Sequence, residues 1–262
     1  MTAWAGVAIG EAGGADAGRV VGLDLRYKGL TGDLPAALGG LTALTELGLG
    51  GNKLSGEVPA ALGALTALTG LYLSDNRLTG NVPAALGALT ALAALGLRGN
   101  QLTGVPAALG GLPALWYLGL QDNRLTSVPA ELRGLTALTF LGLGGNQLTS
   151  VPAELGGLTA LTSLRLERNQ LTSVPEELGG LTALTSLHLE RNQLTSVPAD
   201  LGALTALTEL YLNKNELTSV PADMGALTAL TTLNLENNQL TSVPAEWAEG
   251  GALQTSGCAI TW

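Results

Sequence analysis

The chain contains only one cysteine, Cys258, and one histidine, His188. A single cysteine excludes a disulfide bond within the chain. One cysteine and one histidine also cannot supply the ligands of a zinc site. The repeat described below separates the two residues by roughly 15 Å at strand spacing, so they form no nucleophile–base pair. We therefore expect no enzyme activity, no metal and no cofactor, with His188 at the surface and Cys258 as a small buried thiol.

Long apolar runs and basic leader segments are also missing. The most apolar stretch, residues 88–97, is interrupted by Thr90 and Gly96, so no segment is long enough for a transmembrane helix. The first 18 residues lack a basic region and carry Glu11 and Asp16, which is not typical of a signal peptide. We expect no membrane insertion. We expect the cytoplasm or another reducing compartment, unless the sequence is a piece of a longer chain.

A leucine-rich motif fills almost the whole chain. Residues 161–183 read LTSLRLERNQLTSVPEELGGLTA, and residues 184–206 repeat them with four changes. The first three repeats span 24 residues and the next seven span 23; they begin at Val20, Leu44, Leu68, Leu92, Leu115, Leu138, Leu161, Leu184, Leu207 and Leu230. Such units bury their apolar faces against their neighbours and build a solenoid. We predict an N-terminal cap at 1–19, ten repeats at 20–252 and a degenerate capping unit at 253–262.

Each repeat contains the same three local signals. The LxxLxL segment alternates like a strand, with leucines such as Leu164 and Leu166 facing the core. An asparagine follows at one fixed place in nine repeats, where its amide can pair the backbone of adjoining turns. A proline then suits the first turn of a short helix or 3₁₀ turn. Strands separated by a return segment must be parallel, so the sequence predicts an arc with a parallel sheet on its concave face.

The pattern LxxLxLxxNxL followed by Thr-Ser-Val-Pro or Thr-Gly-x-Val-Pro resembles the leucine-rich repeat family over roughly residues 20–252. The Thr-Gly-x-Val-Pro form is similar to the plant-type subclass, and the later repeats resemble those of unicellular algae. Ala8 and Ile9 stand near the place where extracellular plant members carry paired cysteines. The resemblance implies a right-handed α/β solenoid with short helices or 3₁₀ turns on the convex face. It also implies protein–protein recognition, usually on the concave face.

The charge has a mainly structural interpretation. The net charge is −9, and the segments after the prolines hold most of the uncompensated acids. There a carboxylate favours solubility and the helix dipole, with a basic partner on the convex side as the alternative. On the sheet face, Glu167 and Glu190 form an acidic column beside the basic column of Arg168, Arg191 and Lys214, and we expect these exposed charges to compensate one another. Because no uncompensated basic stripe exists, we expect no nucleic-acid partner.

Aromatic residues are scarce but concentrated in or beside the strands. Tyrosine, tryptophan and arginine dominate binding hot spots. Gly96, Gly119 and Gly142 occupy one outward-facing position of three successive strands, which leaves a bare floor for rings or for a partner. The predicted binding strip consists of Tyr72, Trp116, Tyr117, Phe140, Arg165, His188 and Tyr211. The alternative is that these rings only stabilise strand pairing.

These observations predict a non-enzymatic module, monomeric on its own, that binds a protein or peptide on its concave face. Two alternatives stay open. The chain could be a structural subunit held in a larger assembly through its ends or its acidic convex side. It could also be an engineered scaffold, because the later repeats are so uniform.

Overall fold

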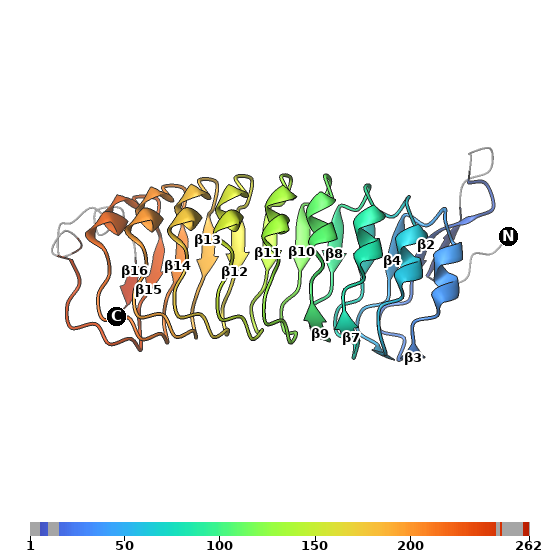
Figure 1. Cartoon of the computed structure of the whole chain (residues 1–262), viewed down its shortest axis with the longest axis horizontal. Coiled ribbons are helices and arrows are strands. Elements are labelled where there is room, and N and C mark those ends of the chain that lie inside the picture. The colour runs from blue at the N-terminus through green and yellow to red at the C-terminus, as the bar shows by residue number, and fades with distance from the viewer. Residues whose placement is uncertain (1–5, 10–15, 245–246, 248–258, 262) are drawn as a thin grey trace.

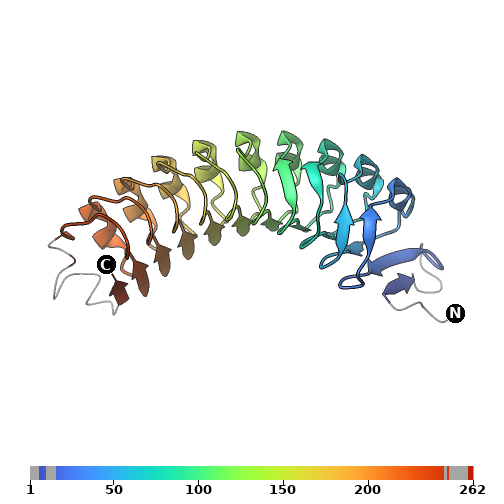
Figure 2. The same cartoon turned by 90° about the horizontal axis from the view of Figure 1, so that it is seen from below.

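The computed structural model describes residues 6–9, 16–244, 247 and 259–261. In this part of the chain the repeats form one elongated, curved array (Figure 1). Strands line the inner side of the curve and short helices line its outer side (Figure 2). The predicted solenoid with a parallel sheet on the concave face is therefore confirmed.

Within the described residues one 12-stranded sheet runs the length of the array. Strand β1 is antiparallel to β2, and every later pairing is parallel. The order is β1 (Val7–Ile9), β2 (Val20–Asp24), β4 (Glu46–Gly48), β6 (Gly70–Tyr72), β8 (Ala94–Gly96), β10 (Tyr117–Gly119), β11 (Phe140–Gly142), β12 (Ser163–Arg165), β13 (Ser186–His188), β14 (Glu209–Tyr211), β15 (Thr232–Asn234) and β16 (Ala259–Thr261). Equivalent residues pair, so each outward-facing position forms a column along the concave face.

Two small sheets lie outside the main one, in the first repeats. They pair β3 (Thr31–Asp33) with β5 (Lys53–Ser55), and β7 (Thr79–Asn81) with β9 (Gln101–Gly104). These strands overlap the Leu-Thr-Gly or Leu-Ser-Gly segments of the first four repeats. The later Thr-Ser-Val-Pro segments have no such strand among the described residues.

The segments after the prolines are 3₁₀ helices of five residues. They are η1 (Ala36–Gly40), η2 (Ala60–Ala64), η3 (Ala84–Ala88), η4 (Ala107–Gly111), η5 (Ala130–Gly134), η6 (Ala153–Gly157), η7 (Glu176–Gly180), η8 (Ala199–Ala203) and η9 (Ala222–Ala226). The placement of proline in the first turn was wrong by one position. Pro152, for example, is the extended residue before η6, and its carbonyl oxygen accepts a bond from the Leu155 amide at 3.2 Å.

The core is built from the repeated leucines, as predicted. Leu164 and Leu166 have no exposed surface, and the equivalent leucines of neighbouring repeats pack above and below them. Full burial of a leucine side chain contributes about 1.5–3 kcal/mol. At the C-terminal end Trp247 is 1% exposed and packs on this core. The caps at 1–19 and 253–262 remain predictions, and Cys258 lies outside the described residues.

The predicted asparagine ladder is present and holds one repeat to the next. Asn146 is buried and donates from Nδ2 to the carbonyl oxygens of Leu143 (2.9 Å) and Leu120 (3.0 Å). Its Oδ1 accepts a bond from the Leu125 amide at 3.0 Å. The same pattern starts at Asn52, which bonds the backbone of Lys28 and Leu30 in the first repeat. The ladder therefore pairs buried backbone groups that the inward turn would otherwise leave unpaired.

Two further repeated features were not predicted. The residue before each ladder position has a positive φ, as at Gly145 (65°) and Arg168 (54°), and this residue turns the chain out of the strand. A threonine ladder runs along the start of the strands. Thr162 Oγ1, for example, donates to the carbonyl oxygen of Thr139 at 3.0 Å. Among the nine positions from Thr45 to Thr231 only Ala93 and Trp116 lack this hydroxyl.

Candidate functional site: an aromatic and charged cleft on the concave face

The strand register brings two of the predicted rings into direct contact. Tyr117 of β10 pairs with Phe140 of β11, and the two rings stack with centroids 4.8 Å apart and planes 12° from parallel. Trp116 meets the Tyr117 ring edge-on at 5.7 Å. Burial raises the pKa of the Tyr117 hydroxyl, so that group stays neutral at physiological pH.

Glycines determine where these side chains lie. A Cβ on Gly119 would stand 3.0 Å from Tyr117 Cε1, and a Cβ on Gly96 would stand 3.4 Å from Tyr72 Cδ1. The predicted floor for the rings is therefore confirmed at these two positions. It is wrong at Gly142, where a Cβ would overlap the side-chain amide of Gln121 instead of a ring.

Trp116 occupies a place that threonine fills in most repeats. The threonine there would donate a hydrogen bond to the preceding repeat, and the indole gives this bond up. Nevertheless Trp116 is 48% exposed, one of two large hydrophobic side chains so exposed among the described residues. A tryptophan at this position therefore loses a structural hydrogen bond and exposes apolar surface. Packing of the sheet alone does not explain such a residue.

The expectation that His188 lies at the surface was wrong. Its outward position on β13 is covered, and the side chain is 10% exposed. The ring stacks on Tyr211 at 4.4 Å, and its nitrogens lie 3.1 Å from Ser186 Oγ and 3.4 Å from Glu190 Oε1. His188 is therefore packed among Ser186, Glu190 and Tyr211 on the concave face, and its predicted contact with a partner stays a prediction.

Four of the seven predicted residues line one cleft of about 730 Å³ on the concave face: Tyr117, Phe140, Arg165 and Tyr211. Tyr72 lies outside it and contacts Arg26 at 5.9 Å from the ring centroid, and Trp116 stands beside it. The cleft also contains residues that the sequence analysis did not select, namely Arg98, Gln121, Asp122, Glu167, Arg168, Glu190, Arg191, Asn213 and Asn234. These follow the strands within a few positions, and an alignment of the outward columns past the strand ends would have found them.

The acidic column of Glu167 and Glu190 is partly buried, contrary to the expectation of exposed charges. Burial is the main cause that raises the pKa of Glu167, and the charge of Glu190 raises it further. Arg165 and His188 oppose this shift. The expected compensation by the basic column is not seen: the ion pairs in the described part of the chain include none between Glu167 or Glu190 and Arg168, Arg191 or Lys214.

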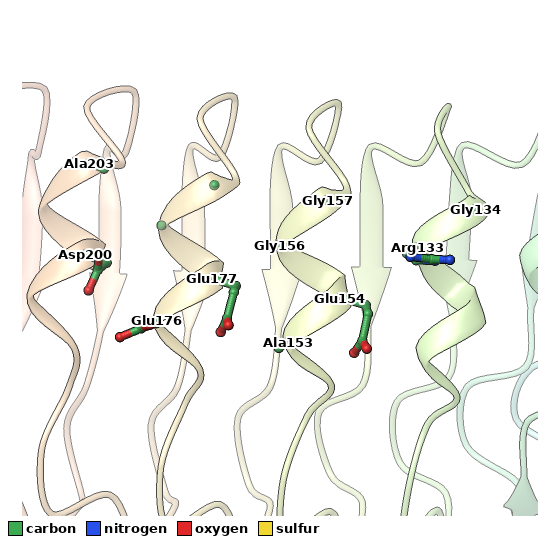
Figure 3. A pocket seen from close by; sticks show the side chains of 12 residues that line it. Arg133, Gly134, Ala153, Glu154, Gly156, Gly157, Glu176, Glu177, Asp200 and Ala203 are labelled. Carbon is green, nitrogen blue, oxygen red and sulfur yellow. The ribbon is translucent and has the colours of Figure 1, made fainter.

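A second hollow, of about 830 Å³, lies on the convex face over η5 to η8. Its charged lining is Arg133, Glu154, Glu176, Glu177 and Asp200, which project from successive helices (Figure 3). Its glycines have a packing role, since a Cβ on Gly156 would stand 2.6 Å from the carbonyl carbon of Glu177 in the next repeat. The acids lie in the first helical turns, as their structural interpretation predicts. We therefore favour the concave cleft as the functional site.

No group of three or more His, Cys, Asp or Glu side chains in the part of the chain that the structure describes is placed to hold a metal ion. No helix in this part of the chain has the length and apolar character needed to span a bilayer.

Comparison with sequence families gives three matches of one kind. A model described as "Leucine-rich repeat region" matches residues 104–216, and one described as "Leucine rich repeat" matches 44–102 and 66–125. A third, "Leucine Rich repeats (2 copies)", matches 205–247. Together they extend from residue 44 to residue 247. No curated protein matches the sequence.

Several solved structures are similar to this chain. A leucine-rich repeat protein of Leptospira interrogans is 34% identical, with a TM-score of 0.74, over 86% of this chain and 62% of that one. A plant ice-binding protein is 28% identical, with a TM-score of 0.79, over 99% and 86%. The Arabidopsis receptor kinase HAESA, in complex with the peptide hormone IDA and the co-receptor SERK1, is 33% identical, with a TM-score of 0.73, over 80% and 36%. The chain thus spans less than two thirds of the Leptospira protein and about a third of the receptor structure.

Proposed function

The chain belongs to the leucine-rich repeat family, and from this premise we propose that it is a non-enzymatic module that binds an extended peptide or protein segment in its concave cleft. The family consists generally of binding modules without catalysis, and the similar receptor HAESA is in complex with a peptide hormone. The cleft offers stacked rings, exposed arginines and partly buried carboxylates on a rigid sheet. Rigid aromatic anchors are the groups that carry binding energy in protein interfaces.

The observation that carries the proposal is the interruption of the threonine ladder at Trp116. If the rings served strand pairing alone, a threonine would be the better residue at this position, because it would add one more interstrand hydrogen bond. Trp116 instead extends the Tyr117–Phe140 stack toward solvent.

The test is a selection of random peptides displayed on phage against the immobilised protein. We expect enriched peptides whose affinity falls at least about tenfold for the double variant Tyr117→Ala, Phe140→Ala, which corresponds to about 1.4 kcal/mol. The matched control is Glu154→Gln on the convex face, which should bind as the unmodified protein does. Enriched peptides that bind the double variant equally well would place binding on another surface and favour the assembly-subunit alternative.

A second candidate function rests on a different surface. Six consecutive repeats expose a threonine–serine pair after the ladder asparagine, from Thr126–Ser127 to Thr241–Ser242. Repeats held in register at roughly the strand spacing of 4.8 Å give a regular array of hydroxyl and methyl groups. Such an array can order water, and the plant ice-binding protein matches nearly the whole chain.

An ice-recrystallisation assay tests this second candidate. If the protein binds ice, ice crystals should stay small in its presence. They should grow in the presence of the double variant Thr172→Lys, Thr195→Lys, because the two lysines interrupt the array. The double variant Tyr117→Ala, Phe140→Ala should leave this effect unchanged. Crystal growth equal to that with serum albumin would rule the candidate out.

A further inference from the structure

Three buried oxygen atoms in the concave cleft have no hydrogen-bond donor among the described residues. They are Gln121 Oε1, Glu167 Oε2 and Glu190 Oε2. The other buried and unpaired side-chain atom of the described residues, Trp247 Nε1, belongs to the C-terminal end. Buried polar atoms are normally paired, because an unpaired one costs the full desolvation of the group. The cleft therefore concentrates acceptors that need donors.

Glycines on β11 and just after it leave room for two of these acceptors, Gln121 and Glu167. A Cβ on Gly142 would overlap the Gln121 amide, and a Cβ on Gly144 would overlap the Glu167 carboxylate. Gln121 leans in from the repeat before, and Glu167 leans in from the repeat after. Two outward positions of one repeat thus lack side chains and are covered by polar groups from both neighbours.

The surrounding charges do not satisfy these acceptors. In the described part of the chain, Arg98 pairs with Asp122 at 3.0 Å, and His188 contacts the other oxygen of Glu190, Oε1. Arg168 and Arg191 are exposed at the turn positions with positive φ. No ion pair joins Arg165 to Glu167 among these residues.

A ligand that pairs these acceptors donates several hydrogen bonds and is favoured by the negative charge of Glu167 and Glu190. A guanidinium carries five N–H groups in one plane and no acceptor, and it stacks on aromatic faces. The Tyr117–Phe140 stack lines the same cleft as Glu167 and Glu190. A cation over such rings gains about 0.5–2 kcal/mol, depending on its exposure.

We propose that Glu167, Glu190 and Gln121 form a subsite for the guanidinium of an arginine side chain, flanked by the Tyr117–Phe140 stack. The inference rests on the proposed function and specifies its ligand: the bound peptide is basic at this point. The exposed Arg168 and Arg191 in the same cleft would instead favour an acidic group on the peptide. The test below distinguishes a basic ligand from an acidic one.

The single histidine gives a specific reporter, because His188 contacts Glu190 directly beside the subsite. The ring ¹H–¹³C signals of His188 are followed while N-acetyl-arginine methylamide is added to the whole protein. The neutral isostere N-acetyl-citrulline methylamide and the acidic N-acetyl-aspartate methylamide are the comparison probes. We expect a saturable shift with the arginine probe and at least tenfold weaker binding of the other two.

Glu167→Gln should weaken binding of the arginine probe at least tenfold, whereas Glu154→Gln on the convex face should not change it. Equal binding of the citrulline probe, preference for the aspartate probe, no saturable shift, or full binding to Glu167→Gln would each overturn the proposal. Selected peptides that bind the cleft without a basic residue would overturn this inference alone. If the arginine probe bound but the phage selection yielded no peptide, the proposed function would be refuted and the guanidinium subsite would stand.

Discussion

Two adjacent glycines in one 3₁₀ helix should respond in opposite ways to alanine. Gly156 of η6 faces the next repeat, where a Cβ would stand 2.6 Å from the carbonyl carbon of Glu177 and 3.0 Å from its Cβ. Gly157 faces open space, since no atom lies within 4 Å of a Cβ built there. The two substitutions add the same methyl group, so their difference measures the packing between repeats.

The expected magnitudes follow from this geometry. Alanine at Gly157 should stabilise the fold by about 0.4–1 kcal/mol, because it restricts the unfolded chain without a clash. Alanine at Gly156 should destabilise it by about 1–3 kcal/mol, because a neighbouring backbone must move. Other repeats contain similar exchanges. Ala64 and Ala203 occupy the position of Gly157, whereas within η1 to η9 the position of Gly156 holds a non-glycine residue only at Arg133, which lines the convex hollow.

Equilibrium unfolding in guanidinium chloride, followed by circular dichroism, measures both effects. For a chain of this size, 1 kcal/mol corresponds to a shift in Tm of roughly 2–4 °C. If the two alanines changed stability equally, or if Gly156→Ala were neutral, close backbone contact between the helices would not determine the spacing of the repeats.

Three further predictions concern the ladders and the cleft. Trp116→Thr should raise the free energy of unfolding by about 0.5–1.5 kcal/mol, because the threonine hydroxyl restores a hydrogen bond to the Ala93 carbonyl. The same variant should bind the selected peptides at least about tenfold more weakly. A lower stability in calorimetry would contradict the role given to the threonine ladder. Asn146→Ala should cost about 2–4 kcal/mol in denaturant unfolding, because it leaves the buried Leu125 amide unpaired and removes one of the two ladder hydrogen bonds that the Leu120 and Leu143 carbonyls each accept. Gln147→Ala, at the exposed neighbouring position, should cost little. The raised pKa of Glu167 means that the native state binds this proton more tightly than the unfolded chain, so its contribution to stability falls as pH rises from the ordinary value of 4.5. The advantage of Glu167→Gln over the unmodified protein should therefore grow between pH 4 and pH 7, and a constant difference in unfolding experiments across that range would refute the assignment.

The sequence predicts the fold because the same local pattern of residues recurs in every repeat. Leucine alternation gives the strands, and the fixed asparagine gives the ladder, as Leu164 and Asn146 illustrate. The threonine ladder and the positive φ before the asparagine were missed because they depend on backbone geometry between repeats. A residue such as Arg168 carries no signal by itself for a left-handed conformation.

The site was predicted less completely, because the arrangement of its side chains depends on which of them lie over the glycines of neighbouring repeats. Periodicity places Tyr117 beside Phe140, and the structure confirms this contact. It also places His188 outward, but it cannot show that Ser186, Glu190 and Tyr211 cover that ring. Gln121 and Glu167 enter the cleft because Gly142 and Gly144 leave room for them, which is a relation between three repeats.

The most direct test of the account is to map where a selected peptide lies. A peptide that carries a photo-reactive group should cross-link to residues of β10 to β14 and to the turns that follow these strands, and competition with the unlabelled peptide should remove the cross-links. Cross-links confined to the convex helices η5 to η8, or to the exposed threonine–serine pairs, would contradict binding in the concave cleft.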